Sequence, residues 1–209
     1  MLPVGLRNVL DQRSNNRISI HRRIGRRLCL VLLTLTRKFA AKTKCAWLRM
    51  AYPSLTLGRS VQLAYSSRVL ISDEGQTEVG DRTHISPFAM VRNNGGTLKI
   101  GNDVFIGQGT IIAAAYELYI GDDVLIAENV TIRDQDHGTA PGSPYRTQPP
   151  QCCRTVVGNN VWIAAGVVVV KGVTIGDNAI VGAGSVVTRD VKSNTIVVGS
   201  PARPLRKNE

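Results

Sequence analysis

The chain has 209 residues, of which 43% are hydrophobic, and its formal net charge at pH 7 is +11. This length allows one main domain with short appendages, and the hydrophobic fraction is sufficient for a core. The charge excess lies in residues 1–50, which carry twelve Lys or Arg and one acid, whereas residues 51–209 carry fourteen of each. The part that follows residue 50 therefore lacks the net positive charge typical of a nucleic-acid-binding domain, and no nucleic-acid partner is expected.

Residues 1–55 are predicted to form a basic amphipathic helical segment. Between Ile20 and Phe39, apolar residues recur at spacings of three or four, which is the period of one helix face. In one interpretation, the segment lies on an anionic membrane surface through residues 1–50, where each basic residue adds about 1 kcal/mol. In the other, the helix caps the open end of the domain that follows, where strand edges must be covered.

The same region bears on location. The charge-free run from Leu28 to Thr36 has nine residues, too few to cross a bilayer, and it lacks the cleavage site of a secretory signal. The four cysteines show no Cys-x-x-Cys spacing, which is consistent with a reducing compartment. We therefore expect a cytoplasmic protein that, in the membrane interpretation, is peripheral to the inner face of the plasma membrane.

Residues 56–198 are predicted to form one repetitive domain. From Val157 to Val187 an aliphatic residue returns at every sixth position, blocks with the same period begin at Ile100 and Ile120, and a looser block begins at Val79. Because strand side chains alternate between two faces, a six-residue unit that buries its first and fifth positions is a short strand with a corner. A helix would need a period near 3.6, and glycine after the aliphatic position supplies the freedom to bend.

Three such units close a triangular coil of eighteen residues, which predicts an all-β solenoid whose coils stack by parallel strand pairing. Four segments fit one coil each: 100–117, 120–137, 157–174 and 175–192. Residues 199–209 are predicted to be a C-terminal tail.

The longest interruption of the repeat is a predicted loop over residues 138–156, rich in Gly, Pro and Ser. Long irregular loops on a rigid scaffold are often functional. His137 stands at the mouth of this loop, beside Asp134 and Asp136, either of which could orient its ring. A lone histidine more often has a surface or structural role, and we expect no catalytic role for His84.

The repeat and its motifs resemble the hexapeptide-repeat acyltransferases, over residues 57–207. The motifs are His137-Gly138, the Asn-Asn-Val-Trp-Ile of 159–163, the Gly-Ala-Gly-Ser-Val-Val-Thr-Arg-Asp-Val of 182–191 and the Val-Gly-Ser-Pro-Ala-Arg of 198–203. The resemblance points to the sugar O-acetyltransferases of the galactoside/maltose and polysaccharide-biosynthesis type. It implies a left-handed parallel β-helix, a homotrimer with active sites between subunits, and acetyl-CoA as cosubstrate without a metal. Periodicity alone could not give that handedness, since parallel crossovers are almost always right-handed.

The resemblance also implies roles for individual residues. His137 would be the general base, and Trp162, Asp134 and Asp136 would contact the substrate, although Trp162 could instead pack under the loop. Arg206 would meet the 3′-phosphate of coenzyme A by charge-assisted hydrogen bonds, unless it belongs to a solvated tail with Arg203 and Lys207. The complete set of cofactor-binding residues that the resemblance implies is Ala165, Ala183, Thr188, Arg189 and Arg206.

The expected function is therefore acetyl-CoA-dependent O-acetylation of a sugar hydroxyl, in the context of surface polysaccharide biosynthesis. The acceptor stays undetermined, because the basic segment does not match the N-terminal cap of the galactoside enzymes. Two alternatives stay open: an N-acetyltransferase acting on an amino sugar or amino acid, and a non-enzymatic repeat scaffold. A zinc hydratase on the same solenoid would need three histidine ligands, and the repeat domain has only His84 and His137.

Overall fold

The computed structural model describes Thr36 and residues 39–207. The chain divides into two compact units, residues 1–40 and 41–209, and the second contains the repeats. The predicted apolar stripe from Ile20 lies outside the described residues except for its last member, Phe39. None of the helices among the described residues has the length and apolar character needed to cross a bilayer.

Residues 39–51 are helical. The helix ends two residues before Pro53, because the residue before a proline disfavours helical backbone angles. From residue 41 onward it packs on the first coil of the solenoid, where Cys45 and Leu48 are buried. The Lys44 ammonium donates to the carbonyl oxygens of Ala64 and Tyr65 at 3.0 and 3.1 Å. This part of the basic segment therefore covers the open end of the solenoid, as one of the two interpretations requires.

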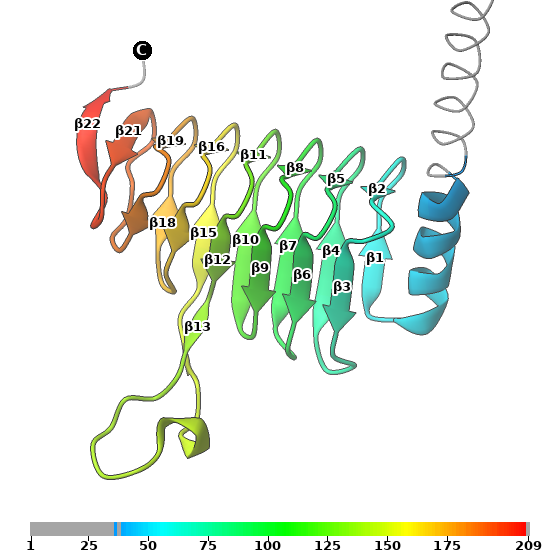
Figure 1. The fold of residues 1–209 in the computed structure, drawn as a ribbon, viewed down its shortest axis with the longest axis horizontal. Helices are drawn as coiled ribbons and strands as arrows, with labels where there is room; N and C mark the ends of the chain where they lie inside the picture. The colour runs from blue at the N-terminus through cyan, green and yellow to red at the C-terminus, as the bar shows by residue number, and fades with distance from the viewer. Residues whose placement is uncertain (1–35, 37–38, 208–209) are drawn as a thin grey trace, which may run out of the picture. The chain divides into compact units, whose positions relative to one another are not determined.

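The solenoid has three sheets, one on each face of a triangular prism (Figure 1), and their strands pair in parallel except at the last edge of one sheet. Sheet A contains β1 (Leu55–Leu57), β4 (Gln76–Val79), β7 (Thr97–Ile100), β10 (Glu117–Ile120), β15 (Thr155–Val157) and β18 (Thr174–Ile175). Sheet B contains β2 (Gln62–Leu63), β5 (His84–Ile85), β8 (Phe105–Ile106), β11 (Leu125–Ile126), β16 (Trp162–Ile163), β19 (Ile180–Val181), β21 (Thr195–Val198) and β22 (Arg203–Lys207). Sheet C contains β3 (Arg68–Ile71), β6 (Met90–Asn93), β9 (Ile111–Ala114), β12 (Thr131–Arg133), β17 (Val168–Val169) and β20 (Val186–Val187). The predicted all-β solenoid is confirmed.

The core is the column of aliphatic residues that the six-residue period predicts. On sheet A, Ile100, Ile120, Val157 and Ile175 are stacked in register and buried. Each such side chain contributes about 1.5–3 kcal/mol by its removal from water. Because every coil repeats this burial on three faces, the stack forms a continuous hydrophobic interior.

The corner between sheets A and B explains the glycine that follows the aliphatic position. A Cβ added to Gly101 would lie 2.6 Å from the carbonyl carbon of Gly121 in the next coil, so only glycine lets the coils approach this closely. Beside it, the backbone N–H of Asn102 donates to Asp122 Oδ1 at 2.6 Å, so one coil satisfies the polar backbone of its neighbour.

Two segments differ from the predicted boundaries. The residues predicted to be a tail turn back as β22, which pairs antiparallel with β21 and covers the last edge of sheet B. The predicted loop is carried by a two-stranded hairpin, in which β13 (Gln135–Asp136) pairs antiparallel with β14 (Gln151–Cys152). We call β13, β14 and the residues 137–150 between them the arm; Figure 1 shows it projecting from the prism.

Candidate functional site

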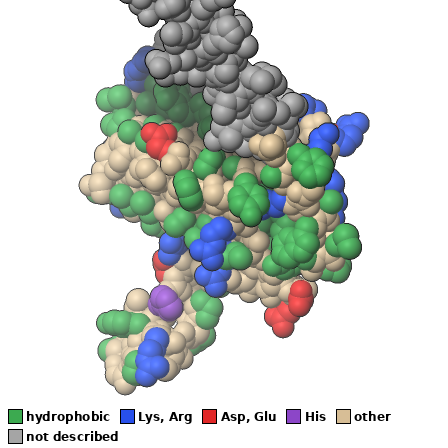
Figure 2. Space-filling model, turned by 45° about the vertical axis from the view of Figure 1, so that its right-hand side comes forward, with side chains coloured by type: hydrophobic (Ala, Val, Ile, Leu, Met, Phe, Trp, Pro, Cys, Tyr) green, Lys and Arg blue, Asp and Glu red, His purple; other side chains and the backbone are tan. Residues whose placement is uncertain are grey.

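His137 is the first residue of the arm after β13, and its side chain is exposed. The next residue, Gly138, is buried, and a Cβ there would lie 2.8 Å from Gln148 Oε1. The Gln148 amide closes the base of the loop, since its Oε1 accepts from the Ala140 N–H and its Nε2 donates to the Ala140 carbonyl, both at 2.9 Å. The imidazole thus stands on a closed loop, which Figure 2 shows as a lobe standing away from the body of the solenoid.

Asp134 has a different position from the expected one. Its carboxylate is buried, and the two oxygens accept hydrogen bonds from the backbone N–H groups of Ala115 and Tyr116 at 2.8 and 2.9 Å. Both oxygens therefore satisfy the corner of the preceding coil, and among the described residues no hydrogen bond joins His137 to Asp134. The expectation that Asp134 orients the histidine or contacts the substrate is corrected by this geometry, because a buried and fully engaged carboxylate is not available to either.

Asp136 is instead paired with a basic residue that the motifs did not indicate. Its Oδ2 lies 3.6 Å from the ammonium of Lys171, which also donates to Gln151 Oε1 at 3.2 Å. Beside this contact, burial raises the pKa of the Cys152 thiol. The described part of the chain contains no group of three His, Cys, Asp or Glu side chains placed to hold a metal.

Trp162 points outward from the middle of sheet B and is 47% exposed. Its register partners Leu125 and Ile180 also point outward, and Leu125 is in turn paired with Phe105. The arm leaves the corner between sheets C and A, away from sheet B, so Trp162 does not pack under the loop of its own chain. The tryptophan belongs to an exposed apolar column on the outer surface of sheet B.

Ala165 and Ala183 lie one above the other on the corner between sheets B and C. The carbonyl oxygen of Ala165 accepts a hydrogen bond from the Gly184 N–H at 2.9 Å, which sets the two turns in register.

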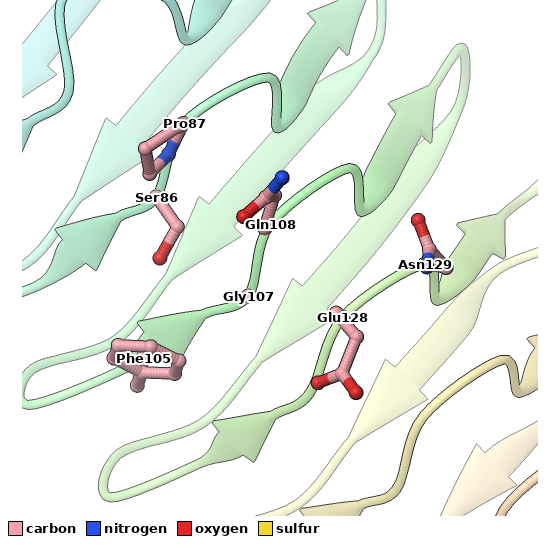
Figure 3. Close-up of a pocket in the computed structure, with 7 residues that line it drawn as sticks. All are labelled: Ser86, Pro87, Phe105, Gly107, Gln108, Glu128 and Asn129. Carbon is pink, nitrogen blue, oxygen red and sulfur yellow. The ribbon is translucent and has the colours of Figure 1, made fainter.

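A cavity of about 480 Å³ lies along earlier turns of the same corner (Figure 3). Gln108 and Glu128 approach it from neighbouring turns, and the ring of Phe105 forms another part of its lining. The motifs did not indicate this cavity. A signal was present, however, because Gln108 and Glu128 occupy the slot two positions after the aliphatic residue, where later units have Ala165 and Ala183.

A second cavity, of about 520 Å³, lies where β22 turns back along β21. Arg189 and Arg206, which are far apart in the chain, both line it, together with Lys192, Arg203 and Lys207. The exposed Thr188 precedes Arg189 on the corner between sheets C and A. The structure thus brings together the basic residues that the sequence analysis expected to bind coenzyme A.

One chain does not bring every predicted site residue together. His137 and Arg189 belong to the corner between sheets C and A, whereas Ala165 and Ala183 belong to the corner between sheets B and C. The buried core of the prism lies between these two corners.

Comparisons with known proteins find similarity between the repeat domain and bacterial transferases. The model of the bacterial transferase hexapeptide (six repeats) matches residues 154–189. The chain is 36% identical over 134 residues to the galactoside O-acetyltransferase of Escherichia coli strain K12, covering 62% of this chain and 63% of that protein. It is 34% identical over 120 residues to WbbJ, a putative lipopolysaccharide biosynthesis O-acetyl transferase of the same organism, covering 54% and 61%. The chain thus spans about three fifths of the length of these relatives.

Two solved structures share the fold. The hexapeptide-repeat acetyltransferase VCA0836 of Vibrio cholerae O1 biovar eltor, complexed with acetyl coenzyme A, has a TM-score of 0.52 and 26% identity, covering 80% of this chain and 78% of that one. The N-acyltransferase AntD of Bacillus cereus, in complex with dTDP and 3-hydroxybutyryl-CoA, has a TM-score of 0.65 and 18% identity, covering 79% and 88%. At that identity, AntD shows likeness of fold alone.

Proposed function

We propose, from the premise that this chain is a hexapeptide-repeat protein, that it is an acetyl-CoA-dependent O-acetyltransferase that acetylates a sugar hydroxyl. The observation that carries the proposal is the exposed imidazole of His137, held on an arm at the one long interruption of the coil. The relatives named galactoside O-acetyltransferase and the fold shared with an acetyl-CoA complex support the same chemistry.

In this mechanism His137 acts as the general base. The imidazole takes the proton of the acceptor hydroxyl while that oxygen attacks the thioester carbonyl. The resulting tetrahedral species collapses by breaking the carbon–sulfur bond, and the imidazolium returns the proton to the departing thiolate. Acetyl ester and free coenzyme A are the products. General-base catalysis of this kind contributes about 10²–10⁴-fold, and backbone N–H groups aimed at the carbonyl oxygen would add to it.

The donor would run along the edge of the prism. The open corner at Ala165 and Ala183 suits the thin pantetheine arm, since small side chains let it approach the backbone. The basic cavity lined by Arg189 and Arg206 suits the phosphate groups, because guanidinium groups form strong bidentate hydrogen bonds to phosphate oxygens.

The acceptor would occupy the cavity beside Gln108 and Glu128. These side chains supply hydrogen-bonding groups for sugar hydroxyls, and the ring of Phe105 supplies an apolar surface for the face of a pyranose. The similarity to WbbJ, whose name refers to lipopolysaccharide biosynthesis, favours a glycan acceptor.

A homotrimer would complete the site, because one chain places His137 and the alanine corner on different edges of the prism. The outward column of Phe105, Leu125 and Trp162 offers an apolar surface for a neighbouring subunit. The test is complementation. Mixing inactive His137→Ala chains with Ala183→Trp chains, in which the bulky ring should block the proposed donor edge, should restore part of the activity if the two residues of one site come from different subunits, and restore none if each site lies within one chain.

Residues 1–50 would hold the enzyme at an anionic membrane, where a lipid-linked glycan is assembled. In the described part of this segment Trp47 and Met50 are 60% and 84% exposed on the helix that follows the basic run. Deletion of residues 1–40, which spares the buried Cys45 and Leu48, should abolish co-sedimentation with phosphatidylglycerol vesicles at low salt, whereas retained binding by the deleted chain would refute the membrane role.

The function itself is tested by a screen of acceptor sugars with acetyl-CoA, in which release of free thiol is followed. Hydroxyl sugars should support turnover that His137→Ala abolishes. Turnover restricted to amino sugars would favour the N-acetyltransferase alternative. A chain that neither binds coenzyme A nor releases thiol would be the repeat scaffold instead.

A further inference from the structure

We propose that Lys171 is a positioning residue that fixes the arm, and with it His137, to the body of the solenoid. The proposal rests on the proposed function, in which His137 is the base. It concerns a side chain that none of the sequence motifs includes.

The position of Lys171 follows from the register of sheet C. Ile132 on β12 is paired with Val169 on β17 of the next coil. Two residues after each of these, Asp134 at the base of the arm and Lys171 therefore lie side by side on the same corner. The lysine side chain is only 21% exposed, which means that its stem is packed along the corner rather than free in solvent.

The ammonium of Lys171 contacts both strands of the arm. It lies 3.6 Å from Asp136 Oδ2 on β13 and donates to Gln151 Oε1 on β14 at 3.2 Å. Asp136 and Gln151 are themselves paired across the two strands. One side chain from the solenoid therefore holds the last rung of the hairpin immediately before His137.

Few other contacts hold the base of the arm. The two-stranded hairpin has two pairs of partners, and below it the Cys153 N–H donates to the Asp134 carbonyl at 2.8 Å. An isolated hairpin of this length is marginal in water. Without the lysine contact, the arm would pivot about Asp134 and the imidazole would sample positions that do not reach the reacting oxygen, and displacements of about 1 Å can cost about 100-fold in rate.

Lys171 also lies one coil before Arg189 on the same corner, since Val169 is paired with Val187. A role in binding the phosphates of the donor would therefore be the competing explanation. The two roles separate in the kinetics, because a positioning residue affects kcat, whereas a donor contact affects the KM for acetyl-CoA.

The experiment compares Lys171→Met, Lys171→Arg and Asp136→Asn in acetyl transfer and in hydrogen exchange of the arm amides. Lys171→Met should lower kcat by about tenfold or more with an unchanged KM for acetyl-CoA, and Lys171→Arg should retain most of the rate. Asp136→Asn should reproduce part of the loss, and the double variant should lose less than the product of the two. Lys99→Met, which removes a lysine 3.0 Å from Glu78 on sheet A, is the matched control and should change nothing.

Hydrogen exchange separates this proposal from the proposed function. In Lys171→Met the amides of Gln151 and Cys153 should exchange faster while those of the core strands stay protected. If the wild-type protein transfers no acetyl group, the proposed function fails, but faster exchange would still establish the attachment. Unchanged exchange, or a raised KM for acetyl-CoA with normal kcat, would overturn the positioning role.

Discussion

The buried carboxylate of Asp134 accepts a hydrogen bond of 2.9 Å from the backbone N–H of Tyr116, which belongs to the corner of the preceding coil. The arm that carries His137 therefore starts from a residue that is fixed to the prism. The carboxylate three residues before the candidate base therefore belongs to the framework of the site and not to its chemistry.

Asp134→Asn should destabilise the protein. The amide presents an N–H group to one of the two part-buried backbone donors, which loses its acceptor at a cost of about 1–3 kcal/mol or less. Urea unfolding at fixed protein concentration would measure the shift in midpoint. Asp136→Asn, at an exposed carboxylate, is the control and should shift the midpoint little; equal shifts in both variants would contradict the framework role.

His137→Ala should lower kcat for acetyl transfer by about 10²–10⁴-fold, the contribution of a general base. Coenzyme A binding, measured by calorimetry, should stay close to that of the wild type, because the side chain is exposed and no described residue depends on it. Transfer at the wild-type rate would remove His137 from the mechanism.

Arg206→Ala should weaken binding of coenzyme A by about 10- to 100-fold, the worth of a charge-assisted hydrogen bond of about 1.5–3 kcal/mol. The loss should vanish with 3′-dephospho-coenzyme A, which lacks the phosphate that the guanidinium is proposed to meet. A loss of the same size for both ligands would place Arg206 elsewhere on the donor.

His84 should make the stability depend on pH. Burial lowers the pKa of this imidazole below its ordinary value of 6.5, and its ring stacks on Phe105 with centroids 5.2 Å apart. Between the two pKa values the unfolded chain binds more protons, so stability should fall as the pH decreases below about 6.5. Thermal unfolding from pH 8 to 5 would show a smaller decrease in His84→Phe than in the wild type, and parallel curves would contradict the assignment.

Ile163→Ala and Trp162→Ala test the strand register. Ile163 is fully buried, so its truncation should cost about 2–5 kcal/mol through lost burial and a cavity. Trp162, one residue earlier, faces outward, and its truncation should cost the fold much less. Urea midpoints at equal concentration would compare them, and the reverse order would mean that the strand is shifted by one residue.

Much of the fold could be predicted because the repeat is local. Ile100, Ile120 and Ile175 are aliphatic at the period that a short strand and a corner require, and each is buried where that pattern indicates. The same reasoning could not predict the strand within residues 199–207, because this segment has no six-residue period. It forms an antiparallel strand only because the last edge of sheet B is free to pair with it.

The sequence by itself determined the stack of coils, the point where the repeat is interrupted, and the histidine at that point. Only the tertiary structure decided that Asp134 faces the preceding coil, that Lys171 meets Asp136, and that Arg189 and Arg206 line one cavity. The reason is that a strand pattern records which face of the chain is buried, a property of neighbouring residues. Contacts around an arm or at the end of a solenoid join residues from different coils, and their partners are set by the stacking of those coils and by how the inserted loop re-enters the stack.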